Sequence, residues 1–176
     1  QGQGGFGPIG RLGPLGLALG EKELSQFTAV ELKGNLKTAL AKKEKLLDQS
    51  LGFLVDAASL PFPDTLAAAL YRCGEAFEHM KTAILESERP AGMNDEEKEQ
   101  YQFLLEEKAF PLEEQAVEYY RRGVKAVRLL KAHNEWVDRT YARLEVIQPW
   151  AYQRSEQASA AWIAPEFPRK VWERVK

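Results

Sequence analysis

Few residues in this sequence have the chemistry of a catalytic centre. It contains one cysteine, Cys73, and two histidines, His79 and His133. Histidine is the side chain that exchanges protons near neutral pH, and a cysteine nucleophile needs a base and an orienting group beside it. Cys73 falls in the apolar stripe of an expected helix, where a buried structural thiol is the favoured interpretation.

Patterns that bind metals or nucleotides are also missing. A di-iron bundle uses Glu-x-x-His pairs, whereas Glu75 and Glu78 precede His79 by four residues and one residue. The sequence has no G-x-x-x-x-G-K-[ST], H-E-x-x-H or G-x-S-x-G motif. We therefore expect no catalytic residue, no metal and no other cofactor, and a chain that is not an enzyme.

Carboxylates gather around a proline in the middle of the chain. The pairs Glu106-Glu107 and Glu113-Glu114 flank Phe110-Pro111. Two carboxylates can act as the acid and base of a glycosidase, and burial of one of them with a raised pKa would indicate such a site. Because nothing else supports catalysis, a carboxylate-using helical-bundle enzyme remains the lesser alternative.

Apolar residues recur at helical spacing over most of the chain. They predict helices from about 23 or 35 to 59, with a possible break at Gly34-Asn35, from Asp64 as N-cap to about 86, from Asn94 past Pro111 to about 132, and from 134 to 147. Asn94 and Glu97 have the spacing of a capping box. We expect an all-α fold of antiparallel helical hairpins packed side by side.

Both ends of the chain differ from this helical part. Residues 1–20 contain eight of the 13 glycines, together with Pro8 and Pro14, so we expect a Gly-rich extended or disordered segment. Residues 21–149 form the expected helical domain. Residues 150–176 are rich in aromatic residues and broken by prolines, and we expect an irregular tail there.

Composition limits the partners of the chain. With 24 Lys and Arg against 26 Asp and Glu, the formal charge is −2, which argues against nucleic-acid binding as the main function. No apolar run is long enough to span a membrane as a helix. Charge is nevertheless segregated: residues 86–118 carry eleven acidic and three basic side chains, and residues 121–176 carry twelve basic and six acidic ones. Such a surface either consists of solvated faces or orients a protein partner.

Two helices resemble a tetratricopeptide (TPR) hairpin, in which small and large residues interlock. Leu70, Gly74 and Phe77 resemble its first helix, and Ala116, Tyr120 and Gly123 its second helix. Gly74 and Ala116 are 42 residues apart, far more than a repeat of about 34 residues allows. The expected hairpin is therefore degenerate and elongated.

A more specific resemblance covers roughly residues 36–156. The segments SERP (87–90), EEKAFPLEEQA (106–116) and NEW (134–136) occur in the order seen in the C-terminal region of bacterial TPR proteins of the gliding-motility type. This family includes accessory proteins of Ton/Tol-like energy transduction. The resemblance implies a non-catalytic interaction scaffold in the periplasm or at the outer membrane of a Gram-negative bacterium. It also implies that the chain is part of a larger repeat protein or a multi-subunit assembly.

Under that interpretation the partners are other proteins of an envelope complex. The expected partner-binding residues are the carboxylates around Pro111 and the conspicuous residues of the other matching segments: Glu106, Glu107, Phe110, Pro111, Glu113, Glu114, Arg89 and Trp136. The other non-catalytic alternative is a cytoplasmic TPR-type adaptor that binds peptides. Such an adaptor needs Lys, Arg and Asn side chains gathered on its concave face.

Overall fold

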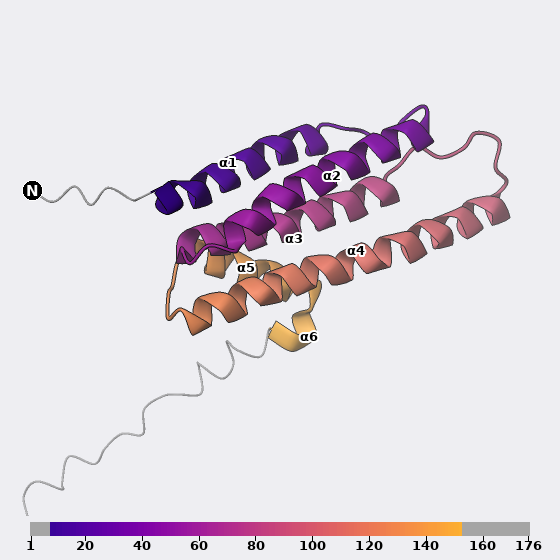
Figure 1. Cartoon of the computed structure of the whole chain (residues 1–176). Coiled ribbons are helices and arrows are strands. Elements are labelled where there is room, and N and C mark those ends of the chain that lie inside the picture. The colour runs from indigo at the N-terminus through magenta and orange to yellow at the C-terminus, as the bar shows by residue number, and fades with distance from the viewer. Residues whose placement is uncertain (1–7, 153–176) are drawn as a thin grey trace, which may run out of the picture.

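The structure, a computed structural model, describes residues 8–152. In that range it consists of helices joined by loops and has no strand. The helices are α1 (Pro8–Thr28), α2 (Leu36–Ala58), α3 (Pro63–Leu85), α4 (Asp95–Leu129), α5 (Glu135–Ile147) and the short α6 (Pro149–Tyr152). Consecutive long helices run antiparallel, as Figure 1 shows. The all-α class and the hairpin arrangement are therefore confirmed.

Helix α3 lies at the centre of the molecule. It contacts α1, α2, α4 and α5, whereas α1 and α5 do not touch each other. Its buried positions are mostly small, which allows neighbouring helices to approach closely: Ala67, Ala68, Ala69, Cys73, Gly74 and Ala76. A side chain on α3 can thus reach any of four other helices.

The prediction of an extended or disordered segment over residues 1–20 is wrong for residues 8–20, which are helical. Helix α1 begins at Pro8 and runs through Pro14 and across the expected domain boundary at residue 20. Gly16 and Gly20 face α2: a Cβ atom at Gly20 would lie 2.6 Å from Cγ of Leu54, and one at Gly16 would lie 3.3 Å from Cβ of Ala57. These glycines let α1 pack closely on α2, and this contact outweighs their poor helix propensity. Residues 1–7 lie outside the described range.

The start of α3 differs slightly from the prediction. Asp64 was expected to be the N-cap, but the N-cap is Phe62, and Pro63 and Asp64 lie in the first turn. Proline suits the first helical position because its fixed φ is helical and its missing N–H would have no partner there. The Asp64 carboxylate instead accepts a hydrogen bond of 2.8 Å from Nδ2 of Asn134.

Two other N-caps, Asn94 and Asn134, are those that the sequence predicts. The Asn94 side chain accepts from the Glu97 N–H while the Glu97 carboxylate accepts from the Asn94 N–H, which completes the capping box of α4. Asn134 caps α5 by accepting from the Val137 N–H. Helix α4 continues through Pro111 as a single helix of 35 residues.

The hairpin of α3 and α4 interlocks at two glycines, Gly74 and Gly123. A Cβ atom at Gly74 would lie 2.4 Å from Cε1 of the fully buried Tyr120, and one at Gly123 would lie 3.5 Å from Cβ of Leu70. The Tyr120 ring thus occupies the space that a side chain at Gly74 would need.

The C-terminal part is described only as far as Tyr152. Helix α6 crosses the expected boundary at residue 150, and the expectation of an irregular tail over 153–176 lies outside the described residues. Within residues 8–152, no helix combines the length and the apolar character that a membrane span requires.

Candidate functional site

The N-terminal half of α4 extends beyond the end of α3. Lys81 on α3 forms an ion pair with Glu113 on α4, so the last residue of α3, Leu85, lies near the level of residue 109. The first buried side chain of α4 is Leu105. We call residues 95–110 the α4 arm; Figure 1 shows it as the long projection at the right of the view.

One side of α4, along the arm and the turn that follows it, combines aromatic and acidic side chains. Phe103 and Phe110 are 66% and 61% exposed, and Glu106, Glu107 and Glu114 are exposed beside them. Because spacings of three, four and seven residues bring helical side chains to one side, these five residues share a surface. We call this surface the acidic-aromatic face.

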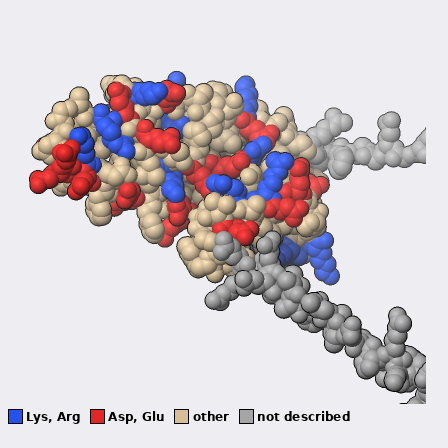
Figure 2. Space-filling model, turned by 180° about the vertical axis from the view of Figure 1, so that it is seen from behind, with Lys and Arg blue, Asp and Glu red and all other residues tan. Residues whose placement is uncertain are grey.

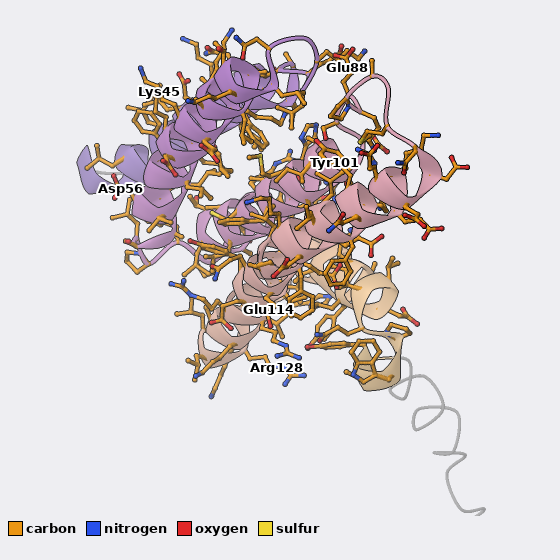
Figure 3. All side chains as sticks on the ribbon, turned by 90° about the vertical axis from the view of Figure 1, so that its right-hand side faces the viewer. Lys45, Asp56, Glu88, Tyr101, Glu114 and Arg128 are labelled. Carbon is orange, nitrogen blue, oxygen red and sulfur yellow. The ribbon has the colours of Figure 1, made fainter. Side chains whose placement is uncertain are left out.

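The loop before α4 supports the arm beside the acidic-aromatic face, where Arg89 lines a hollow of about 450 Å³ together with Phe103 and Glu106. The Arg89 guanidinium donates to the backbone oxygens of Leu85 and Ser87 and to the side chain of Gln102. It also lies over the ring of Tyr101, with 5.7 Å from Cζ to the ring centroid. In Figure 3, which looks from the end where α4 begins, Tyr101 lies toward the loop that carries Glu88.

The eight residues predicted to bind a partner do not form one site. Glu106, Glu107, Phe110 and Glu114 lie together on the acidic-aromatic face, with the exposed Pro111 beside them. The other three have internal contacts, although Arg89 also lines a hollow with Phe103 and Glu106. Arg89 holds the end of α3, Glu113 pairs with Lys81, and Trp136 packs against Tyr71, with 5.5 Å between the ring centroids.

A second surface on α4 has the opposite charge. Arg121, Lys125 and Arg128 are exposed on its C-terminal half, and they line a hollow of about 540 Å³ between α4, α5 and α6. The rest of its lining is largely apolar: Val124, Leu129, Tyr141 and Tyr152. We call it the basic hollow. The sequence indicated its charge, but the hollow needs α5 and α6 to fold back on α4, which no local pattern reveals.

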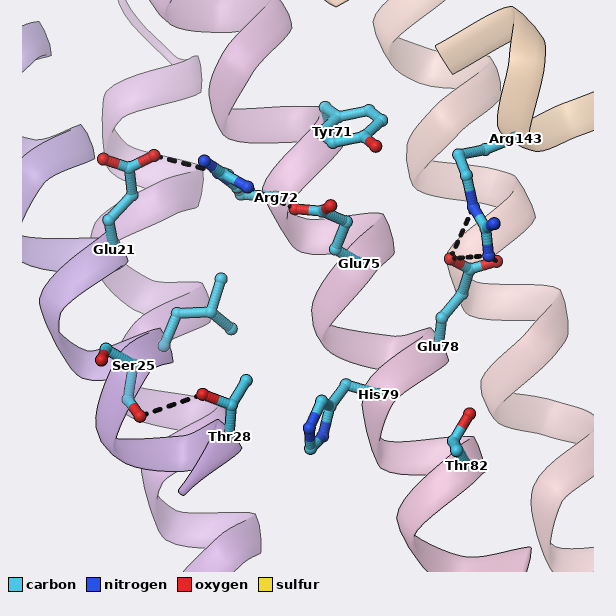
Figure 4. A pocket seen from close by; sticks show the side chains of 11 residues that line it. Glu21, Ser25, Thr28, Tyr71, Arg72, Glu75, Glu78, His79, Thr82 and Arg143 are labelled. Carbon is cyan, nitrogen blue, oxygen red and sulfur yellow. Dashed lines mark hydrogen bonds and ion pairs between the residues drawn. The ribbon is translucent and has the colours of Figure 1, made fainter. Parts of the chain in front are cut away.

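A groove of about 790 Å³ lies between α1, α3 and α5 (Figure 4). Arg72 bridges Glu21 on α1 and Glu75 on α3, at 2.9 and 2.7 Å. Arg143 on α5 makes hydrogen bonds to both carboxylate oxygens of Glu78, at 2.8 and 2.7 Å. The charged groups of the groove thus join helices to one another.

His79 lines the same groove without forming a catalytic pair. Burial lowers its pKa, and the nearby positive charge of Lys43 lowers it further. Its Nδ1 atom is buried without a hydrogen-bond partner, so this nitrogen does not activate Ser25, Thr28 or Thr82, the hydroxyl residues of the groove. A nucleophile and its base would need such a hydrogen bond.

The buried Cys73 lacks the reactivity of a catalytic thiol. Burial raises the pKa of the Cys73 thiol to about 12, so it stays protonated and unreactive at neutral pH. No group of three or more His, Cys, Asp or Glu side chains within residues 8–152 could hold a metal ion.

Comparison with known proteins adds no further constraint. The chain has no significant match among protein-family models, curated proteins or solved structures.

Proposed function

We propose that this chain is a non-catalytic protein–protein interaction scaffold that binds its partner through the acidic-aromatic face of α4. The observation that carries the proposal is the exposure of Phe103 and Phe110, at 66% and 61%, on a helix that extends beyond the rest of the bundle. Aromatic side chains at the centre of an interface supply much of its binding energy. Two such rings, surrounded by carboxylates, would fix both the affinity and the orientation of a partner.

The geometry of the arm suits this role. Phe103 and Phe110 are seven residues apart, which is about 10.5 Å along a helix. The helix holds both rings on one side without further ordering of the backbone, and this lowers the entropic cost of binding. The arm is also acidic, and Figure 2 shows acidic side chains gathered at the end of the molecule where α4 begins.

The two alternatives have less support. A carboxylate-using enzyme would need Glu106 or Glu113 buried in a closed pocket, but Glu106 is exposed and Glu113 pairs with Lys81. An adaptor for peptide C-termini would need free cationic side chains in its groove. Both arginines of the groove are already bound to glutamates.

We also propose a setting for the scaffold from the resemblance to gliding-motility TPR proteins. The acidic-aromatic face lies within the EEKAFPLEEQA segment that carries this resemblance. A location in the periplasm or at the outer membrane, within a larger envelope complex, follows from it. Fractionation of the native bacterium would contradict this setting if the protein were found in the cytoplasm.

The test of the binding surface is site-specific photocrosslinking in the native cell. A photoreactive residue replaces Glu107, and its crosslinked partners are compared between the wild-type background and Phe103→Ala/Phe110→Ala. We expect the double variant to lose most of the crosslinked product. The matched control is Leu15→Ala, which removes an apolar side chain that is 55% exposed on α1. Equal crosslinking in all three backgrounds would exclude the face as a binding site.

A further inference from the structure

We infer that the partner of the acidic-aromatic face is the basic hollow of a second copy of this chain. The inference rests on the proposed function, because it names the occupant of the same surface. It follows from the charges of α4, from the shape and lining of the hollow, and from the symmetry that these two surfaces permit.

Helix α4 carries opposite charges at its two ends. Residues 95–114 contain eight acidic and two basic side chains, whereas residues 121–131 contain five basic side chains and no acidic one. Both sets include exposed residues, Glu106 and Glu107 on the arm and Lys125 and Arg128 at the hollow. Two copies of α4 laid antiparallel would bring each acidic half against the basic half of the other, while a parallel arrangement would oppose like charges.

The hollow also fits the aromatic part of the arm. Its volume of about 540 Å³ is bounded by Val124, Leu129 and Tyr141, with Lys125 and Arg128 at its border. Leu129 is 75% exposed, so an incoming phenyl ring would bury apolar surface that now faces solvent. The basic side chains could then lie over that ring or pair with the glutamates beside it.

Symmetry lets one pair of chains make the contact twice. The centre of the arm near residue 106 and the centre of the hollow near residue 125 are about 28 Å apart along the helix. In an antiparallel pair with a two-fold axis near residue 115, each arm lies over the other copy's hollow. Such an interface closes on itself and yields a dimer.

The experiment measures the self-association of the full chain by sedimentation velocity at low and high salt. We expect a dimer at 50 mM salt whose dissociation constant rises at least tenfold at 500 mM, because added salt screens exposed charges. The variant Glu106→Lys/Glu107→Lys reverses the charge of these two positions on the arm. The variant Lys125→Glu/Arg128→Glu reverses the charge of two positions at the hollow. Each variant alone should be monomeric, and an equimolar mixture of the two should dimerise, because every contact in the mixed pair joins opposite charges.

The mixture also controls for folding, since two misfolded variants would not restore each other. The matched charge control is Glu44→Lys/Asp48→Lys, which makes the same change in net charge at exposed positions of α2 and should still dimerise. A wild-type chain that stays monomeric at 50 mM salt, or a mixture that stays monomeric, overturns the inference. The proposed function is tested separately by the photocrosslinking experiment. Crosslinking to a different protein that depends on Phe103 and Phe110 would support the acidic-aromatic face as a binding surface, and it would exclude a second copy of this chain as the partner.

Discussion

At the scale of single residues, Lys43 is an unusual element of the core. Its side chain is fully buried, and Nζ donates to the backbone oxygens of Phe27 and Val30, at 2.8 and 2.7 Å. It also lies 4.3 Å from the centroid of the Phe27 ring. The ammonium group thus supplies donors to carbonyl groups where α1 ends. Burial nevertheless opposes its charge and lowers its pKa from 10.5 to about 8.

This pKa gives a prediction about stability and pH. Between pH 8 and 10.5 the unfolded chain keeps a proton on Lys43 that the folded chain has lost, so the contribution of Lys43 to folding becomes more favourable as pH rises. We expect the free energy of unfolding of the wild type, relative to Lys43→Met, to increase by about 2 kcal/mol from pH 7 to 9.5. Urea titrations of both proteins at the two pH values would measure it, and a pH-independent difference would contradict it.

The glycines give a second prediction at this scale. Gly20→Ala should destabilise the protein by about 1 to 3 kcal/mol, because the new Cβ would lie 2.6 Å from the buried Leu54. Gly52→Ala is the control: it lies inside α2, and a Cβ there would meet no atom within 4 Å. That substitution should stabilise by up to about 1 kcal/mol through helix propensity alone. Thermal unfolding would separate the two, and a stabilising Gly20→Ala would show that the contact of α1 with α2 is loose.

At the scale of the helices, the sequence predicted the ends that depend on neighbouring residues. The capping box at Asn94 and the cap at Asn134 follow from spacings of three residues, and both occur. Helix α1 could not be predicted in this way, because the role of Gly20 depends on Leu54, which is 34 positions away. The candidate site shows the same division. Helical spacing placed Glu106 and Phe110 on one face, but it could not reveal that Trp136 packs internally or that α5 and α6 form a hollow on α4.

The arm yields a prediction about a single helix. Asn94→Ala removes a cap worth about 1 kcal/mol, and residues 95–104 contain no buried side chain to compensate for its loss. We expect faster amide hydrogen exchange over these residues with little change in global unfolding. Asn134→Ala is the comparison, because the first turn of α5 packs through the buried Val137. It should lower global stability by about 1 kcal/mol, and equal global effects of the two variants would mean that the arm is coupled to the core.

At the scale of the whole molecule, one cluster of polar side chains joins three helices. Glu78 on α3 accepts three hydrogen bonds from Arg143 on α5 and one of 3.0 Å from the hydroxyl of Tyr120 on α4. The Glu78 side chain is only 17% exposed. Burial and the adjacent Glu78 carboxylate raise the pKa of Tyr120, so this phenol remains a donor throughout the physiological range. The packing of α5, which forms one wall of the basic hollow, therefore depends partly on this cluster.

A double-mutant cycle tests that dependence. Arg143→Met leaves the Glu78 carboxylate without its main partner, and Glu78→Gln keeps an acceptor for Tyr120 while removing the charge. We expect each single variant to lose stability and the double variant to lose less than the sum, with a coupling energy of about 1 to 2 kcal/mol. Chemical denaturation would measure the four free energies of unfolding. If the effects were additive, the ion pair would contribute nothing to stability, and other contacts of α5, such as those of the fully buried Leu144, would hold it in place.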